Sequence, residues 1–270
     1  MKLDQARVLL TGASGGIGQA MQQALLQTGA KVLGVSPQRQ APDGANLQWL
    51  QADLTQAQDL ADVAREAAQW QANVLVHAAG LPGFGALPSL PATAIAGVIQ
   101  ANLITPMLLT QAMLAHLQSL PKAQVVFVGS ALGRIGLPGF SVYGASKAGL
   151  HGFAEALRRE LAGGSIRIQT LAPRSTRTGF NSAAAERYNQ ATGTAVDTPQ
   201  TVAQALLHLI EGEAAEQFIG WPERLAVRLN GTLGPLLDSS FSKHRQALAQ
   251  VATDAAIDTT VTTTPSLQGH

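Results

Sequence analysis

The chain is predicted to form an α/β domain, a doubly wound Rossmann-type fold around a parallel sheet of about seven strands. Three observations predict this fold. Short apolar runs alternate with longer amphipathic segments along most of the chain, as strands and their crossover helices do. A glycine-rich loop follows the first apolar run directly. With 270 residues, the chain is long enough for one large domain of this kind.

The composition excludes several classes of function. The formal net charge is +1, which indicates no general affinity for nucleic acid or for an acidic membrane. The chain has no cysteine, which rules out disulfides, thiol catalysis and cysteine-bound metals, and we expect no metal site. The start resembles no signal peptide, and no run approaches eighteen apolar residues. We therefore expect a soluble, cytoplasmic protein.

The first strand is expected at residues 7–11, followed by a glycine loop and a helix at residues 19–28. A glycine loop between a strand and a helix suits a dinucleotide, because backbone N–H groups and the helix dipole can both approach its pyrophosphate. The spacing is G-x-x-x-G-x-G, from Gly12 through Gly16 to Gly18. A plain tight turn is the alternative.

The second strand, residues 31–36, bears on the choice of dinucleotide. An NAD site usually has an acidic residue about twenty positions after the glycines, to bind the ribose 2′-hydroxyl. No acidic residue occurs between Gly18 and Asp43; Ser36 stands near that position, and Arg39 follows. This absence favours NADP, whose 2′-phosphate a carboxylate would repel. Arg39 could bind that phosphate or be a solvated loop charge.

The third and fourth strands are expected at residues 47–50 and 74–80. Between them, Asp53 is interpreted as the N-cap of a helix at residues 56–69, as an adenine contact, or as both. The small residues Ala78, Ala79 and Gly80 would let a flat ring lie against the backbone. His77 stands alone in an apolar strand, and we interpret it as a core histidine rather than a catalytic base.

A long helix is expected at residues 93–117, with Pro106 inside it. A proline has no N–H to bond the carbonyl four residues earlier, which here belongs to Asn102. We therefore expect a kink at this point and a free carbonyl at Asn102 that needs another partner, such as an ordered water.

The chemistry is expected around residues 130–147. Ser130 follows a strand at residues 124–129, and a helix is expected at residues 143–161. Tyr143 and Lys147 are four positions apart and so share one helical face. A tyrosine that exchanges protons at neutral pH needs its pKa lowered by about three units, which a nearby ammonium could supply. Taken alone, the pair could equally be a core tyrosine and a solvated lysine.

The rest of the chain is less regular. We expect a sixth strand at residues 166–173, a mobile lid at residues 181–197, a helix at residues 201–211 and a last strand at residues 217–221. Apolar residues recur at helical spacing over residues 223–248. This extension could pack on the body, which we prefer, or form a dimer or membrane surface. The domain boundaries expected are 1–221, 222–250 and a disordered tail at 251–270.

Taken in order, TGASGGIG, AAG, Asn102, Ser130, Tyr143-x-x-x-Lys147 and a proline loop resemble the short-chain dehydrogenase/reductase family over about residues 7–221. The resemblance implies an NAD(P)-dependent oxidoreductase that interconverts a ketone and an alcohol. It implies that Tyr143 is the acid or base and that Lys147 lowers its pKa and holds the nicotinamide ribose. Ser130 would position the carbonyl oxygen, and the Asn102 carbonyl would hold a water in a proton relay.

The resemblance also implies a set of cofactor-binding residues around NADP, which we prefer, or NAD. These are Thr11, Gly12, Ser14, Gly16, Ile17, Gly18, Ser36, Arg39, Asp53, Leu54, Ala79, Gly80, Tyr143, Lys147, Pro173 and Thr178. The family forms homodimers or homotetramers through the helices that carry Asn102 and Tyr143. The same state is expected here.

Three departures from the family pattern stand out. His77 and Ala78 replace two asparagines that usually brace the strands, and Arg174 replaces a glycine after Pro173. Arg174 and Arg177 are thus expected near the cavity mouth, where they could meet an anionic group. The third departure is the C-terminal extension, which could cover the substrate cleft or bind a partner.

The substrate is expected to be a partly apolar ketone or a 3-oxoacyl compound, because the cleft would draw on Ala131, Leu132, Phe140 and Phe180. The alternative is a catalytically silent nucleotide-binding sensor that uses the extension to bind a membrane or a partner. Another type of Rossmann protein, such as a methyltransferase, would have no use for the Tyr–Lys pair.

Overall fold

The computed structural model describes residues 1–38, 44–220, 227, 230–231 and 234–262. Within them the strands form one parallel sheet of seven, in the order β3-β2-β1-β4-β5-β6-β7, as expected. The strands are β1 Arg7–Thr11, β2 Lys31–Ser36, β3 Leu47–Gln51, β4 Val74–His77, β5 Ala123–Val128, β6 Ile166–Ala172 and β7 Glu216–Phe218. The order reverses between β1 and β4, the point at which ligands bind in folds of this type. β7 is shorter than the strand expected at residues 217–221, of which Trp221 lies outside the described residues.

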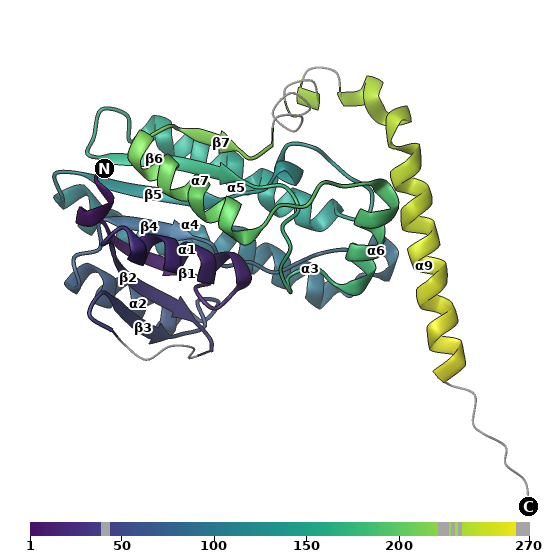
Figure 1. Cartoon of the computed structure of the whole chain (residues 1–270), viewed down its shortest axis with the longest axis horizontal. Helices are drawn as coiled ribbons and strands as arrows, with labels where there is room; N and C mark the ends of the chain where they lie inside the picture. The colour runs from purple at the N-terminus through teal and green to yellow at the C-terminus, as the bar shows by residue number, and fades with distance from the viewer. Residues whose placement is uncertain (39–43, 221–226, 228–229, 232–233, 263–270) are drawn as a thin grey trace, which may run out of the picture.

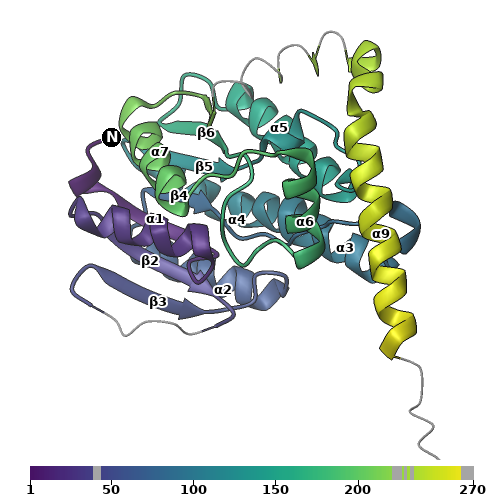
Figure 2. The same cartoon turned by 45° about the vertical axis from the view of Figure 1, so that its right-hand side comes forward.

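Helices cover both faces of the sheet (Figures 1 and 2). The α-helices are α1 Gly16–Gln27, α2 Ala57–Gln69, α3 Ala92–Ile99, α4 Thr105–Ser119, α5 Ser141–Glu160, α6 Ala183–Thr192, α7 Pro199–Gly212 and α9 Ser242–Thr262. Short 3₁₀ turns are η1 Leu3–Gln5, η2 Leu87–Ser89, η4 Ala131–Gly133 and η5 Gly234–Phe241. Side chains alternate along each strand, so that Leu10 packs with α1 and α7 while Leu9 packs with α2, α4 and α5.

The long helix is interrupted where Pro106 predicts. A π-helical turn, η3 Gln100–Ile104, joins α3 to α4, and the N–H of Thr105 donates to the carbonyl of Gln100. Pro106 lies in the first turn of α4, where its missing N–H costs little. Asn102 sits inside this turn and is fully buried.

The whole run Ala92–Ser119 is long and apolar enough to cross a membrane, by length and composition only. The sequence reading missed this because Gln100, Asn102 and Thr105 interrupt the apolar residues. Leu109, Met113 and Leu117 on one face of α4 are completely buried in the core beneath the sheet. That face of the run is therefore already covered by protein.

The lid expected at residues 181–197 contains a regular helix, α6. The Ser182 hydroxyl accepts a hydrogen bond from the N–H of Ala185 at 3.2 Å and caps its start. Gly193 ends the helix in the left-handed conformation, with φ +72°. The weak periodicity of this segment did not predict the helix, which depends on these two terminal signals.

The C-terminal extension packs on the body, as the preferred reading had it. α9 runs alongside α6 at one end of the molecule (Figures 1 and 2). Ala247 and Val251 are buried there against Tyr188 of α6. The helix continues to Thr262, so the tail expected to be disordered from residue 251 is helical over its first part. Residues 263–270, and Leu225, Leu229 and Leu233 of the apolar pattern, lie outside the described residues.

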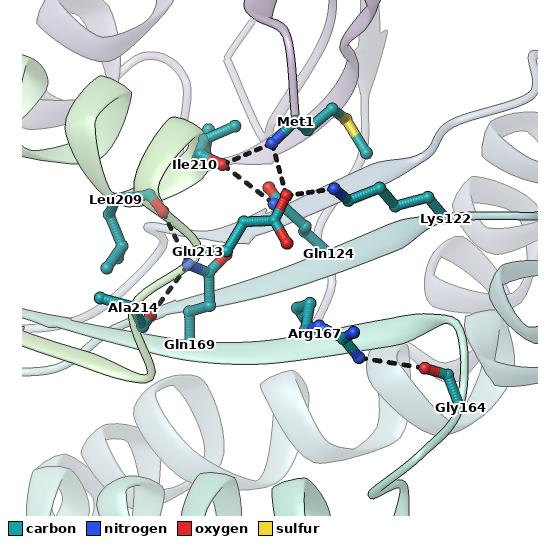
Figure 3. A network of polar contacts seen from close by, with 10 residues as sticks. All are labelled: Met1, Lys122, Gln124, Gly164, Arg167, Gln169, Leu209, Ile210, Glu213 and Ala214. Carbon is teal, nitrogen blue, oxygen red and sulfur yellow. Dashed lines mark hydrogen bonds and ion pairs between the residues drawn. The ribbon is translucent and has the colours of Figure 1, made fainter.

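A network of ion pairs and hydrogen bonds connects the end of α7 to the start of β5 (Figure 3). The Glu213 carboxylate forms ion pairs with the N-terminal ammonium of Met1, at 2.7 Å, and with Lys122. Buried Gln124 and Gln169 donate to the last carbonyls of α7, Gln124 to Ile210 at 3.0 Å and Gln169 to Leu209 at 2.7 Å. The two glutamines thus tie the last turn of α7 to β5 and β6.

Candidate active site

A cavity of about 1310 Å³ lies at the carboxyl ends of the central strands, where the strand order reverses. Most residues predicted for the site line its wall: Gly12, Ser14, Gly16, Ile17, Gly18, Ser36, Asp53, Leu54, Ala79, Gly80, Ser130, Tyr143, Lys147, Pro173 and Thr178. Thr11 and Asn102 lie behind this wall. Arg39 lies outside the described residues.

Three glycines of the loop are packed too tightly to be replaced by a residue with a side chain. Gly12 has φ +67°, and a Cβ on it would lie 2.6 Å from the Cα of Ala79. A Cβ on Gly16 would lie 2.7 Å from Cγ2 of Thr178, and one on Gly18 would collide with the Gly12 carbonyl. Behind the loop, the Thr11 hydroxyl accepts hydrogen bonds from the N–H groups of Ala78 and Ala79, both at 3.2 Å.

The start of α1 faces the cavity without a cap. Its N-cap residue is Gly15, so no side chain satisfies the first N–H groups of the helix. Gly15, Gly16 and Ile17 line the cavity. Unsatisfied N–H groups and the helix dipole together attract an anion, so this wall fits the pyrophosphate of a dinucleotide.

Ser36, the last residue of β2, and Asp53, two residues after β3, also line the cavity. The Ser36 hydroxyl donates to the carbonyl of Gln38, and the Ser14 hydroxyl donates to the Gln38 side chain at 3.3 Å. Gln38 also lines the cavity. It was not predicted, because no motif in the sequence around it indicates a binding residue. Asp53 is the one carboxylate among the described residues of the cavity wall.

Asp53 is not the N-cap of α2, contrary to one of the two expectations. The helix begins at Ala57 after Gln56. The Asp53 carboxylate instead accepts from the N–H and the hydroxyl of Thr55, at 3.0 and 2.8 Å, and so forms a local turn. The other interpretation, an adenine contact, is compatible with its place on the cavity wall.

Ser130, Tyr143 and Lys147 come together, although the electrostatics differ from expectation. The Ser130 side chain hydrogen-bonds Tyr143 and also accepts from the N–H of Leu132 at 3.2 Å. Burial raises the pKa of Tyr143 to about 12, and the hydrogen bond from Ser130 opposes this only in part. Burial also lowers the pKa of Lys147 to about 8.

The expected lowering of the Tyr143 pKa by an adjacent ammonium was therefore wrong for the chain itself. Nζ of Lys147 lies 5.8 Å from the centre of the Tyr143 ring and donates to the Val128 carbonyl at 2.9 Å. The cost of placing a phenolate in a low-dielectric site exceeds what this cation returns. The spacing fixes which face the two residues share, but it leaves the direction of a long lysine side chain open.

The Asn102 side chain braces the site from behind. Its Oδ1 accepts from the N–H of Leu81 at 2.7 Å, while its Nδ2 donates to the carbonyl of Leu81 at 3.0 Å and to the Ser146 hydroxyl at 3.1 Å. A Cβ on Gly80 would lie 3.0 Å from Oδ1 of Asn102 and 3.8 Å from Nζ of Lys147. The sequence pointed to the carbonyl of Asn102, and it missed this role of the side chain.

His151 is a neighbour of the site that the sequence reading overlooked. It lies four positions after Lys147 on the same helical face, which is the signal that could have found it. Its Nε2 is 3.2 Å from the Ser130 carbonyl, which can only accept, so Nε2 carries the hydrogen. Its Nδ1 is 3.4 Å from the Glu216 carboxylate, an ion-pair distance without good hydrogen-bond geometry. Contacts with His151 and Arg134 lower the pKa of Glu216.

A family model described as short chain dehydrogenase matches residues 6–189, more than half of the chain. The chain belongs to the short-chain dehydrogenase family. It is accordingly an NAD(P)-dependent oxidoreductase that acts on a small molecule.

Curated relatives of this short-chain dehydrogenase include two 3-oxoacyl-[acyl-carrier-protein] reductases named FabG. The Escherichia coli protein is 28% identical over 80% of this chain and 93% of its own length. The Vibrio cholerae protein is 27% identical over the same shares. The ketoacyl reductase HetN of Nostoc is 28% identical over 78% of this chain and 77% of its own length.

Solved structures support the fold. A short-chain dehydrogenase from Burkholderia cenocepacia in complex with NADP has a TM-score of 0.79 at 22% identity, over 90% of this chain and 99% of its own. One from Burkholderia phymatum in complex with NAD has a TM-score of 0.78 at 20% identity, over 87% and 96%.

Two of the departures from the family pattern now have a structural account. His77 is buried in the core, where Nε2 lies 2.9 Å from the Thr110 hydroxyl and the ring stacks on Phe127 with centroids 4.9 Å apart. Burial, with a smaller contribution from the Lys147 charge, lowers its pKa to about 3. This confirms the interpretation of His77 as a core histidine. The ring replaces the asparagine by stacking within the core.

Arg174 does not offer a free charge to a substrate, contrary to expectation. Its guanidinium binds both carboxylate oxygens of Asp197, at 2.9 and 2.8 Å. Arg177 is exposed, and it is absent from the described wall of the cavity. The Arg174–Asp197 pair instead ties the segment after β6 to the segment before α7.

Another part of the cavity wall is mainly apolar. The four residues expected in the substrate cleft, Ala131, Leu132, Phe140 and Phe180, all line it. The ring of Phe180 meets the edge of Tyr143, with centroids 6.1 Å apart. Residues of the C-terminal extension also line the cavity.

Proposed function

We propose that this short-chain dehydrogenase reduces the ketone of a partly apolar, 3-oxoacyl-type substrate, with NADPH as the preferred cofactor. One observation carries the proposal: Ser130, Tyr143 and Lys147 line the same cavity as the glycine loop and a group of apolar side chains. The names of the curated relatives, two 3-oxoacyl reductases and a ketoacyl reductase, agree with this substrate class.

Tyr143 is the proton donor in this proposal. Because its pKa is raised to about 12, the phenol stays protonated at neutral pH and can donate to a carbonyl oxygen. Ser130 would hold the same oxygen through its hydroxyl. Lys147, with its pKa near 8, keeps most of its charge at neutral pH and would stabilise the phenolate left behind.

The cofactor supplies the hydride when it is bound. Gly12, Gly16 and the uncapped start of α1 would hold its pyrophosphate, and Asp53 would contact the adenine. The other cofactor residues expected from the sequence belong to the same proposal. The carbonyl of Asn102, in the π-helical turn, would hold a water that relays protons to Lys147.

The preference for NADPH rests on the end of β2. Ser36 stands there in place of an acidic residue, and the wall beside it carries Pro37 and Gln38, which have no charge to repel a 2′-phosphate. Ser36→Asp would place a carboxylate at this point, and Arg39→Ala would remove the cation that follows three positions later in the sequence. Both variants should raise the Kd for NADPH more than the Kd for NADH, whereas equal effects on the two would remove these residues from the argument.

We further propose that the enzyme is a soluble cytoplasmic protein that forms a homodimer or homotetramer. Ile104 and Leu108 lie four positions apart along the helical run, and they are 38% and 44% exposed. Large apolar side chains grouped in this way favour contact with a second copy.

The experiment that tests the proposed function measures NADPH oxidation with a panel of ketones and 3-oxoacyl thioesters. We expect the wild type to reduce members of this panel. Tyr143→Phe should reduce kcat roughly 10²- to 10⁴-fold, the usual contribution of a general acid, while the Kd for NADPH stays unchanged. Binding of NADPH without turnover of any substrate would instead favour the nucleotide-binding sensor.

A further inference from the structure

The C-terminal extension forms part of the substrate cavity. Leu237 and Phe241 of η5 and His244 of α9 all line it. Leu236, next to Leu237, points the other way and is 77% exposed. Of two adjacent leucines, one therefore faces the cavity and the other faces solvent.

The extension is held in place by a cluster of aromatic rings. Tyr188 of α6 is fully buried, and its hydroxyl lies 2.7 Å from Nδ1 of His244. Its ring lies 5.2 Å from that of Phe84 and 5.6 Å from that of Phe140, measured between centroids. Buried Val251 of α9 packs on the same cluster. The extension is thus bound to the body by a small core of its own.

The same cluster reaches the loops that carry the reaction centre. Phe140 immediately precedes α5, three positions before Tyr143, and Phe84 belongs to the loop after β4. The N–H of Gly85 donates to the carbonyl of Gly139 at 2.9 Å, which joins the two loops. The wall that the extension supplies is therefore fixed relative to Tyr143.

The charges of the cavity indicate what this wall can accept. Asp53, Lys147 and Arg174 are the acidic and permanently basic residues among the described residues that line the cavity. Asp53 belongs to the part of the wall that is proposed to hold the nucleotide. Lys147 donates a hydrogen bond to the Val128 carbonyl, and Arg174 is paired with Asp197. Near the extension the described wall offers the apolar side chains of Leu237, Phe241, Phe84 and Phe140, together with the uncharged polar side chains of Asn230 and Ser240 and the ring of His244. A chain without charges suits this surface.

We propose that the C-terminal extension selects substrates that carry an extended apolar chain on the carbonyl group. This rests on the proposed function and names the part of the substrate that the extension recognises. Leu237 and Phe241 contact the chain, while the Tyr188–His244 hydrogen bond and the aromatic cluster hold them in position. Each methylene group buried against this wall should tighten binding roughly fourfold.

Two truncations and one matched control test this. Leu237→Ala and Phe241→Ala remove contacts with the chain, whereas Leu236→Ala removes an equal side chain from the solvent side. In a series of straight-chain 3-oxoacyl thioesters, the two truncations should raise KM for the longest substrates at least about fivefold. KM for the shortest substrate, and kcat for every substrate in the series, should stay unchanged. Leu236→Ala should match the wild type, and Phe241→Leu should show a smaller shift than Phe241→Ala.

A binding measurement separates this inference from the proposed reaction. The neutral, apolar fluorophore N-phenyl-1-naphthylamine can be displaced from the protein by straight-chain alcohols, with no turnover needed. Longer alcohols should displace it better, and this dependence on length should weaken in Leu237→Ala and Phe241→Ala. Displacement that depends on chain length, without turnover of any ketone, would support recognition of the chain by the extension and contradict only the proposed reaction. An unchanged length dependence in both truncations, or an equal change in Leu236→Ala, would overturn the inference.

Discussion

Tyr143, Lys147 and His77 are three ionisable residues for which burial disfavours the charged form. The pKa of the tyrosine is raised to about 12, that of the lysine is lowered to about 8, and that of the histidine is lowered to about 3. At neutral pH the phenol and the imidazole are therefore neutral, and the ammonium keeps most of its charge. A protonated phenol beside a cation is suited to giving a proton to a carbonyl oxygen.

The burial of His77 predicts how stability depends on pH. The folded state keeps this histidine neutral down to about pH 3, whereas in the unfolded chain it binds a proton near pH 6.5. Between these values the unfolded state holds the extra proton, so the free energy of unfolding falls as the pH falls. His77→Phe keeps a ring beside Phe127 and removes this titration. In urea denaturation the variant should lose less stability between pH 6.5 and pH 3 than the wild type does; equal losses would contradict this account.

The contacts of His151 predict that it positions Ser130. His151→Leu removes the N–H that the Ser130 carbonyl accepts, and Ser130 should then move from its place beside Tyr143. We expect kcat to fall about tenfold with the Kd for NADPH unchanged, since small displacements of reacting groups are costly. His151→Gln, which can still donate, should recover part of the loss. A stability loss without change in kcat would make His151 merely structural.

Much of the site could be predicted at this scale, because its glycines, Ser130, Tyr143 and Lys147 stand in a recognisable order. The direction of the Lys147 side chain could not be predicted, since it depends on the Val128 carbonyl of another element. The pairing of Arg174 with Asp197 was hidden for the same reason, because 23 positions separate the two residues. Spacing along one helix predicts which residues share a face, but contacts between elements decide their charge state.

At the scale of the element, the π-helical turn η3 connects two parts of the site. Asn102 points from this turn to the loop after β4, through Leu81, and to α5, through Ser146. Pro106 allows the turn because it cannot complete the regular hydrogen-bond pattern. The turn thus places one amide side chain where three elements meet.

The two sides of this junction should differ in their contribution to stability. Asn102→Ala removes three hydrogen bonds, one of them buried, and leaves the N–H of Leu81 without its partner, so the free energy of unfolding should fall by roughly 3 kcal/mol. Ser146→Ala removes one acceptor for Asn102 and should cost about 1 kcal/mol. Chemical denaturation of both variants measures the difference. Equal losses would show that Asn102 does not hold the junction together.

The elements themselves were predictable where apolar periodicity is strong, as in the strands, α5 and α7. Pro106 predicted the break in the long helix because proline has a fixed effect on helical hydrogen bonds. α6 was missed because its sequence is rich in alanine and polar residues, and the helix depends on the Ser182 cap and the buried Tyr188. Tertiary contacts rather than local pattern decide such a segment.

At the scale of the whole molecule, the site and the polar network around Glu213 lie at opposite ends of the sheet. The network around Glu213 holds α7 where β5 begins, whereas the cavity opens where the same strands end. The extension lies beside α6 at one end of the molecule (Figure 2), and its residues Leu237, Phe241 and His244 line the cavity. The sequence offered this position of the extension as one alternative but could not select it, because the pattern over residues 223–248 shows an apolar helix face without showing what covers it.

The exposed apolar residues of the helical run predict the oligomeric state. Leu108→Glu places a charge on the surface proposed to contact a second copy, and the cost of burying that charge should dissociate the assembly. Sedimentation should show a lower mass for this variant than for the wild type. Leu236→Glu, at an exposed leucine elsewhere, is the control and should keep the wild-type mass. A wild type that sediments as a monomer would contradict the proposed assembly.

The most direct measurement of the central claim follows hydrogen from the cofactor to the product. NADPH carrying deuterium on the transferring face of the nicotinamide is incubated with a long-chain 3-oxoacyl thioester, and the product is analysed by mass spectrometry. The account predicts one deuterium on the new carbinol carbon with the wild type, and almost no product with Tyr143→Phe. No labelled alcohol from the wild type, or equal amounts from the variant, would contradict it.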